Sequence, residues 1–130
     1  MNGEITALYA SLIGVLLVLV SFRVASYRKN NQIGIGNNND NQLERRIRVQ
    51  ANLVEYAPIA LLLMYFCEIR GVGHIYIHVF GILLVLARAA HAYGLNRSAG
   101  YTLSRFIGAL TTFVLIIILS GVNLVHYFIH

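Results

Sequence analysis

Charge is scarce in this sequence. Asp, Glu, Lys and Arg together make up 12% of its 130 residues, whereas 58% of the residues are hydrophobic and the mean hydropathy is +0.67. Soluble globular domains carry about 25% charged residues. The shortage of charge therefore excludes an ordinary soluble domain and indicates a chain that resides in a lipid bilayer.

The apolar segments also lack the alternation of apolar and polar residues that marks a membrane β-barrel. A hydrocarbon core about 30 Å thick needs roughly 20 apolar helical residues, and continuous runs without alternation favour helices. Four such runs occur, at residues 5–22, 49–67, 72–87 and 106–129. They predict an all-α fold: one transmembrane four-helix bundle over 1–130, with helices near 4–28, 43–69, 73–93 and 101–128 and a loop at 30–42.

Other absences narrow the class of protein. Residues 1–27 have no basic region before the apolar run and no convincing small-residue cleavage site, so we expect a retained span rather than a signal peptide. The single cysteine, Cys67, excludes an internal disulfide. No internal repeat supports an inverted-repeat transporter. The five histidines show no pairing with a carboxylate that is typical of metal ligands, and no metal is expected.

Negative charge is scarcer than positive charge, and nearly all the basic residues flank the connections that are expected on one side of the membrane. Five acidic residues stand against ten basic ones. The basic residues flank the first connection between helices (Arg23, Arg28, Lys29, Arg45, Arg46, Arg48) and the third (Arg88, Arg97, Arg105), and Arg70 alone lies beside the second. The positive-inside rule places the basic loops in the cytoplasm, in a bacterial cytoplasmic membrane or one like the endoplasmic reticulum. Membrane lipids are expected partners, and nucleic acids are not.

Against this background, the start of the second apolar run is unusually polar. Glu44, Arg45, Arg48, Asn52 and Glu55 fall within about a third of the circumference of a helix. Part of this polar stripe has a structural explanation, because Glu44 and Arg48 are spaced as an i,i+4 ion pair. Glu55 lies deeper, however, where a carboxylate normally faces a protein interior or a wet cavity. The stripe therefore also predicts one wall of a pocket for a small zwitterionic or anionic peptide-like ligand.

The spacing E-R-x-x-R-x-Q-x-N-x-x-E-Y-x-P over residues 44–58 closely resembles the second-helix signature of the MAPEG family, the membrane-associated proteins in eicosanoid and glutathione metabolism. The segments SFRVASYRK at 21–29, ARAAHAY at 87–93 and RSAGYTL at 97–103 are similar to other family segments. The resemblance implies a homotrimer that binds glutathione as co-substrate between subunits. It implies glutathione-binding roles for Arg28, Arg45, Arg48, Gln50, Asn52, Glu55, Tyr56, His91 and Tyr93.

The resemblance also implies a glutathione transferase, with peroxidase activity as a further property, in which a cation stabilises the thiolate that attacks a lipophilic electrophile. Arg97 is preferred for this catalytic role because Ser98 and Tyr101 match the family context, and Arg105 is the alternative. Leu95 stands where the family has a tyrosine, and Tyr93 is the candidate to replace it.

Two other functions remain open at this point. One is a non-catalytic family member that binds lipid or acts as a scaffold. The other is a small four-helix multidrug exporter, which matches in length. Such exporters depend on a carboxylate within the first helix, whereas here the first helix has only Glu4, at its very start.

Overall fold

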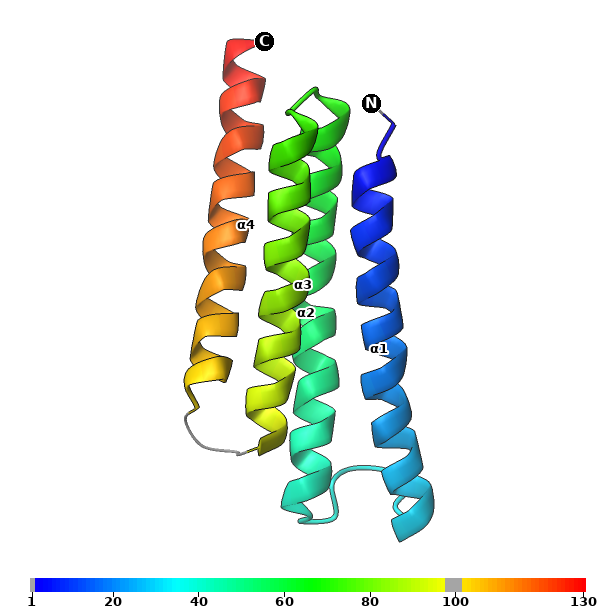
Figure 1. The fold of residues 1–130 in the computed structure, drawn as a ribbon. Coiled ribbons are helices and arrows are strands. Elements are labelled where there is room, and N and C mark those ends of the chain that lie inside the picture. The colour runs from blue at the N-terminus through cyan, green and yellow to red at the C-terminus, as the bar shows by residue number, and fades with distance from the viewer. Residues whose placement is uncertain (1, 98–101) are drawn as a thin grey trace.

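The computed structural model of the protein describes residues 2–97 and 102–130. These residues form four α-helices, α1 (Glu4–Asn31), α2 (Asn41–Ile69), α3 (His74–Arg97) and α4 (Leu103–Ile129), and contain no strand. The helices run antiparallel to one another in chain order, and both chain termini lie at the same end of the bundle (Figure 1). Each helix contains a segment long and apolar enough to cross a membrane. The predicted all-α membrane bundle is confirmed.

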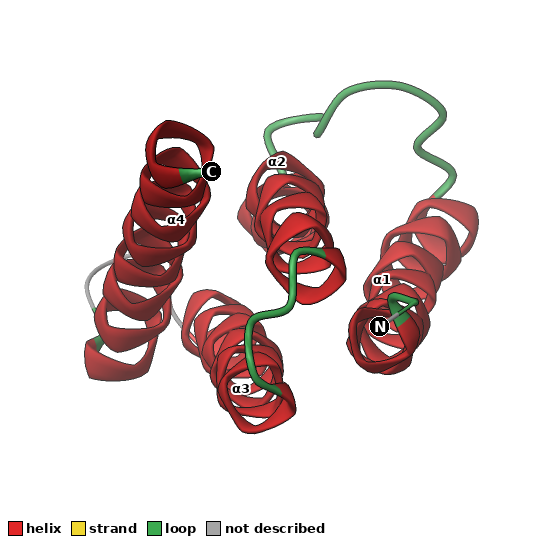
Figure 2. Cartoon of the chain, turned by 90° about the horizontal axis from the view of Figure 1, so that it is seen from above, coloured by secondary structure: helices red, strands yellow, loops and turns green. Residues whose placement is uncertain are grey.

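α2 and α3 form the centre of the bundle. Each of them contacts all three other helices, whereas α1 and α4 do not contact each other within the described residues. Viewed along the bundle, α1 and α4 lie on opposite sides, with α2 and α3 between them (Figure 2). The buried apolar core is centred on Met64, Ile77, Leu84 and Leu119, each with about 1% of its surface exposed or less. Most residues of every span stay on the outer surface, as expected where the surroundings are hydrocarbon.

The start of α2 is fixed by a side-chain cap. Asp40 precedes the helix, and its Oδ1 accepts hydrogen bonds from the backbone N–H groups of Gln42 (2.9 Å) and Leu43 (3.1 Å). The Tyr27 hydroxyl of α1 donates to the other carboxylate oxygen at 2.6 Å. The Tyr27 hydrogen bond, followed by the backbone N–H groups, holds the pKa of Asp40 below its usual range. The loop between α1 and α2 is thereby tied to both helices.

The opposite end of α2 caps α1 in the same manner, across 62 residues of sequence. Glu68 is buried, with 2% of its surface exposed. Its carboxylate accepts hydrogen bonds from the backbone N–H of Ile5 (3.0 Å) and from the N–H (2.8 Å) and hydroxyl (2.6 Å) of Thr6. The first N–H groups of a helix lack partners within it and carry a partial positive charge. Glu68 satisfies these groups and joins the N-terminus of α1 to the bundle.

We expect Glu68→Gln to lower the free energy of unfolding by about 1–3 kcal/mol, because a neutral amide offers only one acceptor oxygen to this buried group of donors. The measurement is thermal unfolding of the detergent-solubilised protein followed by circular dichroism. Glu4→Gln is the matched control, since Glu4 lies in the same helical turn but is exposed. Equal stability of the two variants would contradict the capping role.

Candidate functional site

A buried arginine connects three helices in the half of the bundle that contains the polar stripe. Arg88 of α3 is 2% exposed. Its Nη2 donates to Oδ1 of Asn52 on α2, and its Nη1 donates to the hydroxyl of Thr112 on α4 at 3.2 Å. Thr112 in turn donates to the carbonyl of Gly108, 2.8 Å away within its own helix. A charged group inside a span is costly unless protein groups replace its hydration, and these two partners do so.

The interior around Arg88 has further polar atoms that are not satisfied. Among the described residues, Arg88 Nε and His91 Nδ1 are buried without a hydrogen-bond partner. The Tyr56 ring lies 6.0 Å from the Arg88 guanidinium carbon and packs edge-on against Phe113 with ring centroids 5.3 Å apart. Buried polar atoms without partners are uncommon in native structures and often mark a position for water, an ion or a ligand. They mark this interior as the candidate site.

The position of His91 depends on a close approach between α3 and α4. A β-carbon added at Gly108 would lie 2.5 Å from the carbonyl oxygen of Ala87 and 2.9 Å from the β-carbon of His91, so only glycine permits this contact. Gly108 therefore sets how closely α4 approaches the buried His91 of α3.

The polar stripe of α2 divides between the interior and the outer surface. Asn52 turns inward to Arg88, whereas Arg48 and Glu55 form an ion pair at 3.7 Å with side chains 46% and 48% exposed. This is the one ion pair within residues 2–97 and 102–130. The expected Glu44–Arg48 pair does not form there, because Glu44 instead accepts a hydrogen bond from Asn37 at 2.9 Å. The spacing of residues along α2 could not predict this contact, because Asn37 lies in the loop before the helix.

Other predicted glutathione-binding residues contact α1 and its loop. Gln50 donates to the Ser21 hydroxyl at 2.9 Å, and Arg28 donates to the Gly36 carbonyl at 2.8 Å. Within one chain, the predicted residues thus form an interior group, an outward ion pair and a group on α1 rather than one closed pocket.

The thiolate end of the predicted site is described only in part. Arg97 is the last residue of α3, and its side chain lies outside the described part, as do Ser98 and Tyr101. Arg105 lies in the first turn of α4, partly exposed. Arg45 is also partly exposed and Tyr93 is 58% exposed. Within the described ranges, no cluster of three His, Cys, Asp or Glu residues is arranged to hold a metal ion.

Sequence reasoning placed Arg88 in the basic flank of the third connection and within the family-like segment 87–93, but it gave Arg88 no role in the site. Its position could have pointed to a site role. Arg88 directly follows the apolar run 72–87 within the predicted third helix, and an ionisable residue inside a span normally has a specific partner.

Comparison with known proteins gives two findings. The sequence profile of the MAPEG family matches residues 6–125. The chain is also 38% identical over 92 residues to the inner membrane protein YecN of Escherichia coli strain K12, and equally to YecN of E. coli O6:H1 strain CFT073. Each alignment covers 71% of this chain and 70% of the relative.

The interior network predicts non-additive mutational effects. Asn52→Leu removes a partner of the buried guanidinium and should lower the free energy of unfolding by about 2–3 kcal/mol. Combining it with Arg88→Met removes the stranded charge, so the double variant should be more stable than Asn52→Leu alone. Thermal unfolding by circular dichroism measures the unmodified protein, the single variants Asn52→Leu and Arg88→Met, and the double variant. Simple addition of the two single losses would show that the pair is not coupled.

The glycine at the contact between α3 and α4 gives a second test. Gly108→Ala forces a β-carbon against backbone atoms and should destabilise the protein by about 1–3 kcal/mol, minus the helix propensity gained. Gly121→Ala is the matched control in the same helix, since nothing lies within 4 Å of its added β-carbon. Gly121→Ala should leave the unfolding temperature unchanged or raise it. The opposite order of stability would refute the packing argument.

Proposed function

Because this chain belongs to the MAPEG family, we propose that it is a membrane-bound glutathione transferase that activates glutathione as a thiolate and conjugates it to lipophilic electrophiles. The same thiolate would also be competent to reduce lipid hydroperoxides. The observation that carries this proposal is the polar site of Arg48, Asn52, Glu55 and Arg88, formed within an apolar bundle.

The chemistry of the site fits glutathione. Its two carboxylates suit the guanidinium groups of Arg28 and Arg48, with Arg45 as a further candidate, and its ammonium suits the carboxylate of Glu55. Arg88 engages the side-chain oxygen of Asn52 and so fixes the orientation of that amide. The Tyr56 ring packs edge-on against Phe113 and lies 6.0 Å from the Arg88 guanidinium carbon, beside the site.

We propose that the active protein is a homotrimer with the site between subunits. The side chains of Arg48 and Glu55 are about half exposed on the outside of one chain, and both residues lie in a helix long and apolar enough to cross a membrane. Leaving both charges in lipid would cost several kcal/mol, so a neighbouring copy that covers them is favoured. Arg28 contacts the loop of its own chain rather than this ion pair. In the proposed trimer, the Arg28 side chain at each site would therefore come from the neighbouring copy.

Thiolate formation requires a cation near the sulfur, because a free thiol has a pKa of about 8.5 and is mostly protonated at neutral pH. Arg97 remains the preferred residue, with Arg105 as the alternative. Both belong to the end of the bundle where α4 begins, with Thr102 as its N-cap. The partial positive charge of a helix N-terminus also favours an anion there.

The protein is an integral multi-pass membrane protein. We propose a bacterial cytoplasmic membrane, with the two basic connections and the site on the cytoplasmic side. The relatives named inner membrane proteins agree with this location. The exporter hypothesis has no comparable support. Small four-helix exporters depend on a carboxylate in the first helix, whereas Glu55 lies on α2, and the matching family profile is that of MAPEG.

The test is ultraviolet difference absorbance of the detergent-solubilised protein titrated with glutathione at neutral pH. A saturable thiolate band is expected. Arg48→Ala should weaken glutathione binding about 10- to 100-fold, because a charge-assisted hydrogen bond is lost. Arg97→Ala should spare binding, measured by equilibrium dialysis, but remove the band.

Arg23→Ala is the control, since Arg23 is an exposed arginine at the same end of the bundle. An unchanged band in Arg97→Ala with a lost band in Arg105→Ala would move the catalytic role to Arg105. Absence of both binding and band in the unmodified protein would contradict the transferase and favour the non-catalytic lipid-binding scaffold.

A further inference from the structure

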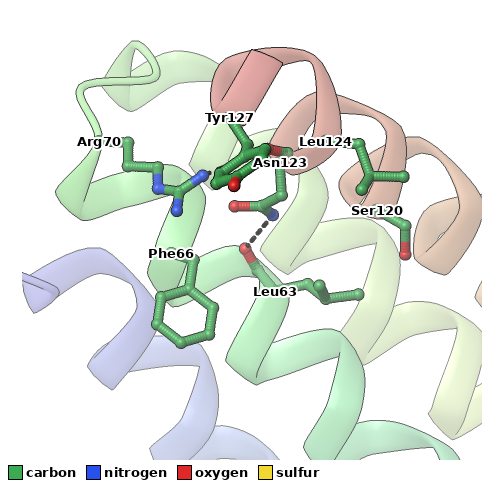
Figure 3. A pocket seen from close by; sticks show the side chains of 7 residues that line it. All are labelled: Leu63, Phe66, Arg70, Ser120, Asn123, Leu124 and Tyr127. Atoms are coloured by element: carbon green, nitrogen blue, oxygen red, sulfur yellow. Dashed lines mark hydrogen bonds between the residues drawn. The ribbon is translucent and has the colours of Figure 1, made fainter. Parts of the chain in front are cut away.

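A groove lies between α2 and α4 at the end of the bundle that carries both chain termini, opposite the polar stripe. Its volume is about 370 Å³, and its lining consists of Leu63, Phe66, Arg70, Ser120, Asn123, Leu124 and Tyr127 (Figure 3). The groove opens on the outer surface, where Phe66 is 38% and Leu124 is 59% exposed. It therefore faces the surrounding lipid rather than the interior of the bundle.

The groove has an apolar floor and a polar rim. Leu63 and Phe66 form the floor, while the guanidinium of Arg70 points toward the Tyr127 ring at the rim (Figure 3). Arg70 follows Leu63 by seven positions, which is about 10 Å along a helix. The side-chain amide of Asn123 donates to the carbonyl of Leu63 at 3.2 Å and holds the two walls together. This arrangement of an apolar trough below a cation matches an acyl chain below a phosphate.

The positive charge at the rim has no carboxylate partner among the described residues. Arg70 Nη1 donates to the backbone carbonyl of Asn123 at 3.2 Å, and the one ion pair within the described ranges is at the other end of the bundle. A second hollow shares Arg70 and Tyr127 and adds His126 and His130, whose rings stack 4.5 Å apart. Arg70 is also the only Lys or Arg beside this connection. The rim is thus a local positive patch, at an end where the carboxylate of Glu68 is already bound to the start of α1 and Glu4 lies on α1 rather than on the groove.

We propose that this groove is a binding site for an anionic glycerophospholipid of the leaflet on the side of the chain termini. One acyl chain lies along Leu63 and Leu124, and the headgroup phosphate accepts hydrogen bonds from the Arg70 guanidinium. Guanidinium groups bind phosphate oxygens in a fork geometry, and the apolar floor selects a lipid over a free phosphate ion. The site is independent of the proposed glutathione chemistry, because it shares no residue with it.

The test is native mass spectrometry of the delipidated full-length protein after incubation with mixed micelles containing phosphatidylglycerol or phosphatidylcholine. The unmodified protein should retain phosphatidylglycerol in preference to phosphatidylcholine. Arg70→Gln should reduce this preference roughly fivefold to tenfold, and Arg70→Lys should restore part of it. Arg23→Gln, at the other end of the bundle, should keep the full preference.

Leu124→Trp provides a second variant that does not touch the charge. Its exposed position tolerates a larger side chain, and the indole would fill the trough, so retention of both lipids should fall. Unchanged phosphatidylglycerol retention in Arg70→Gln and Leu124→Trp would overturn the proposal. A change of oligomeric state in these variants with lipid retention unaltered would also overturn it and assign the groove to a second copy of the chain.

Discussion

The burial of the Arg88 guanidinium is the constraint on which the rest of this bundle depends. Lipid cannot solvate a cation, so α3 can sit in the membrane only where α2 and α4 present Asn52 and Thr112 to it. These hydrogen bonds fix the rotation of three helices relative to one another. The absence of a side chain at Gly108 then brings α4 close enough for the network to form.

The same principle operates at the opposite end of the bundle. Helices in a bilayer gain little from burying apolar surface, because lipid is as apolar as the core, so packing contacts and hydrogen bonds between helices determine their arrangement. Glu68 binds the N-terminus of α1, and Asn123 joins α4 to the carbonyl of Leu63 on α2. A few polar contacts near each end thus align four helices whose outer surfaces are almost wholly apolar.

The outward-facing ion pair of Arg48 and Glu55 belongs both to the proposed glutathione site and to the proposed contact between subunits. Arg48 and Glu55 form an ion pair with both side chains about half exposed, on a helix long and apolar enough to cross a membrane, where charges exposed to lipid would be costly. In the trimer that we propose, a neighbouring copy would cover this ion pair, and the hydrogen-bonded Asn52 and Arg88 of each chain would form the inner wall of the site. The groove between α2 and α4 lies at the opposite end of the bundle, which carries both chain termini (Figure 1).

The sequence alone determined that the protein is a four-helix membrane protein, because hydrocarbon admits only segments that satisfy their own backbone and few charges interrupt the apolar runs. It also determined family membership through the spacing at 44–58. Helical periodicity placed Arg48, Asn52 and Glu55 on one side but does not specify partners. Only the tertiary structure brought Asn52 into contact with Arg88 and placed Asn37 where it donates to Glu44. It also brought Glu68 to the N-terminus of α1, 62 residues earlier in the sequence. Those partners come from other helices and loops, whose relative rotation depends on packing rather than on any local pattern.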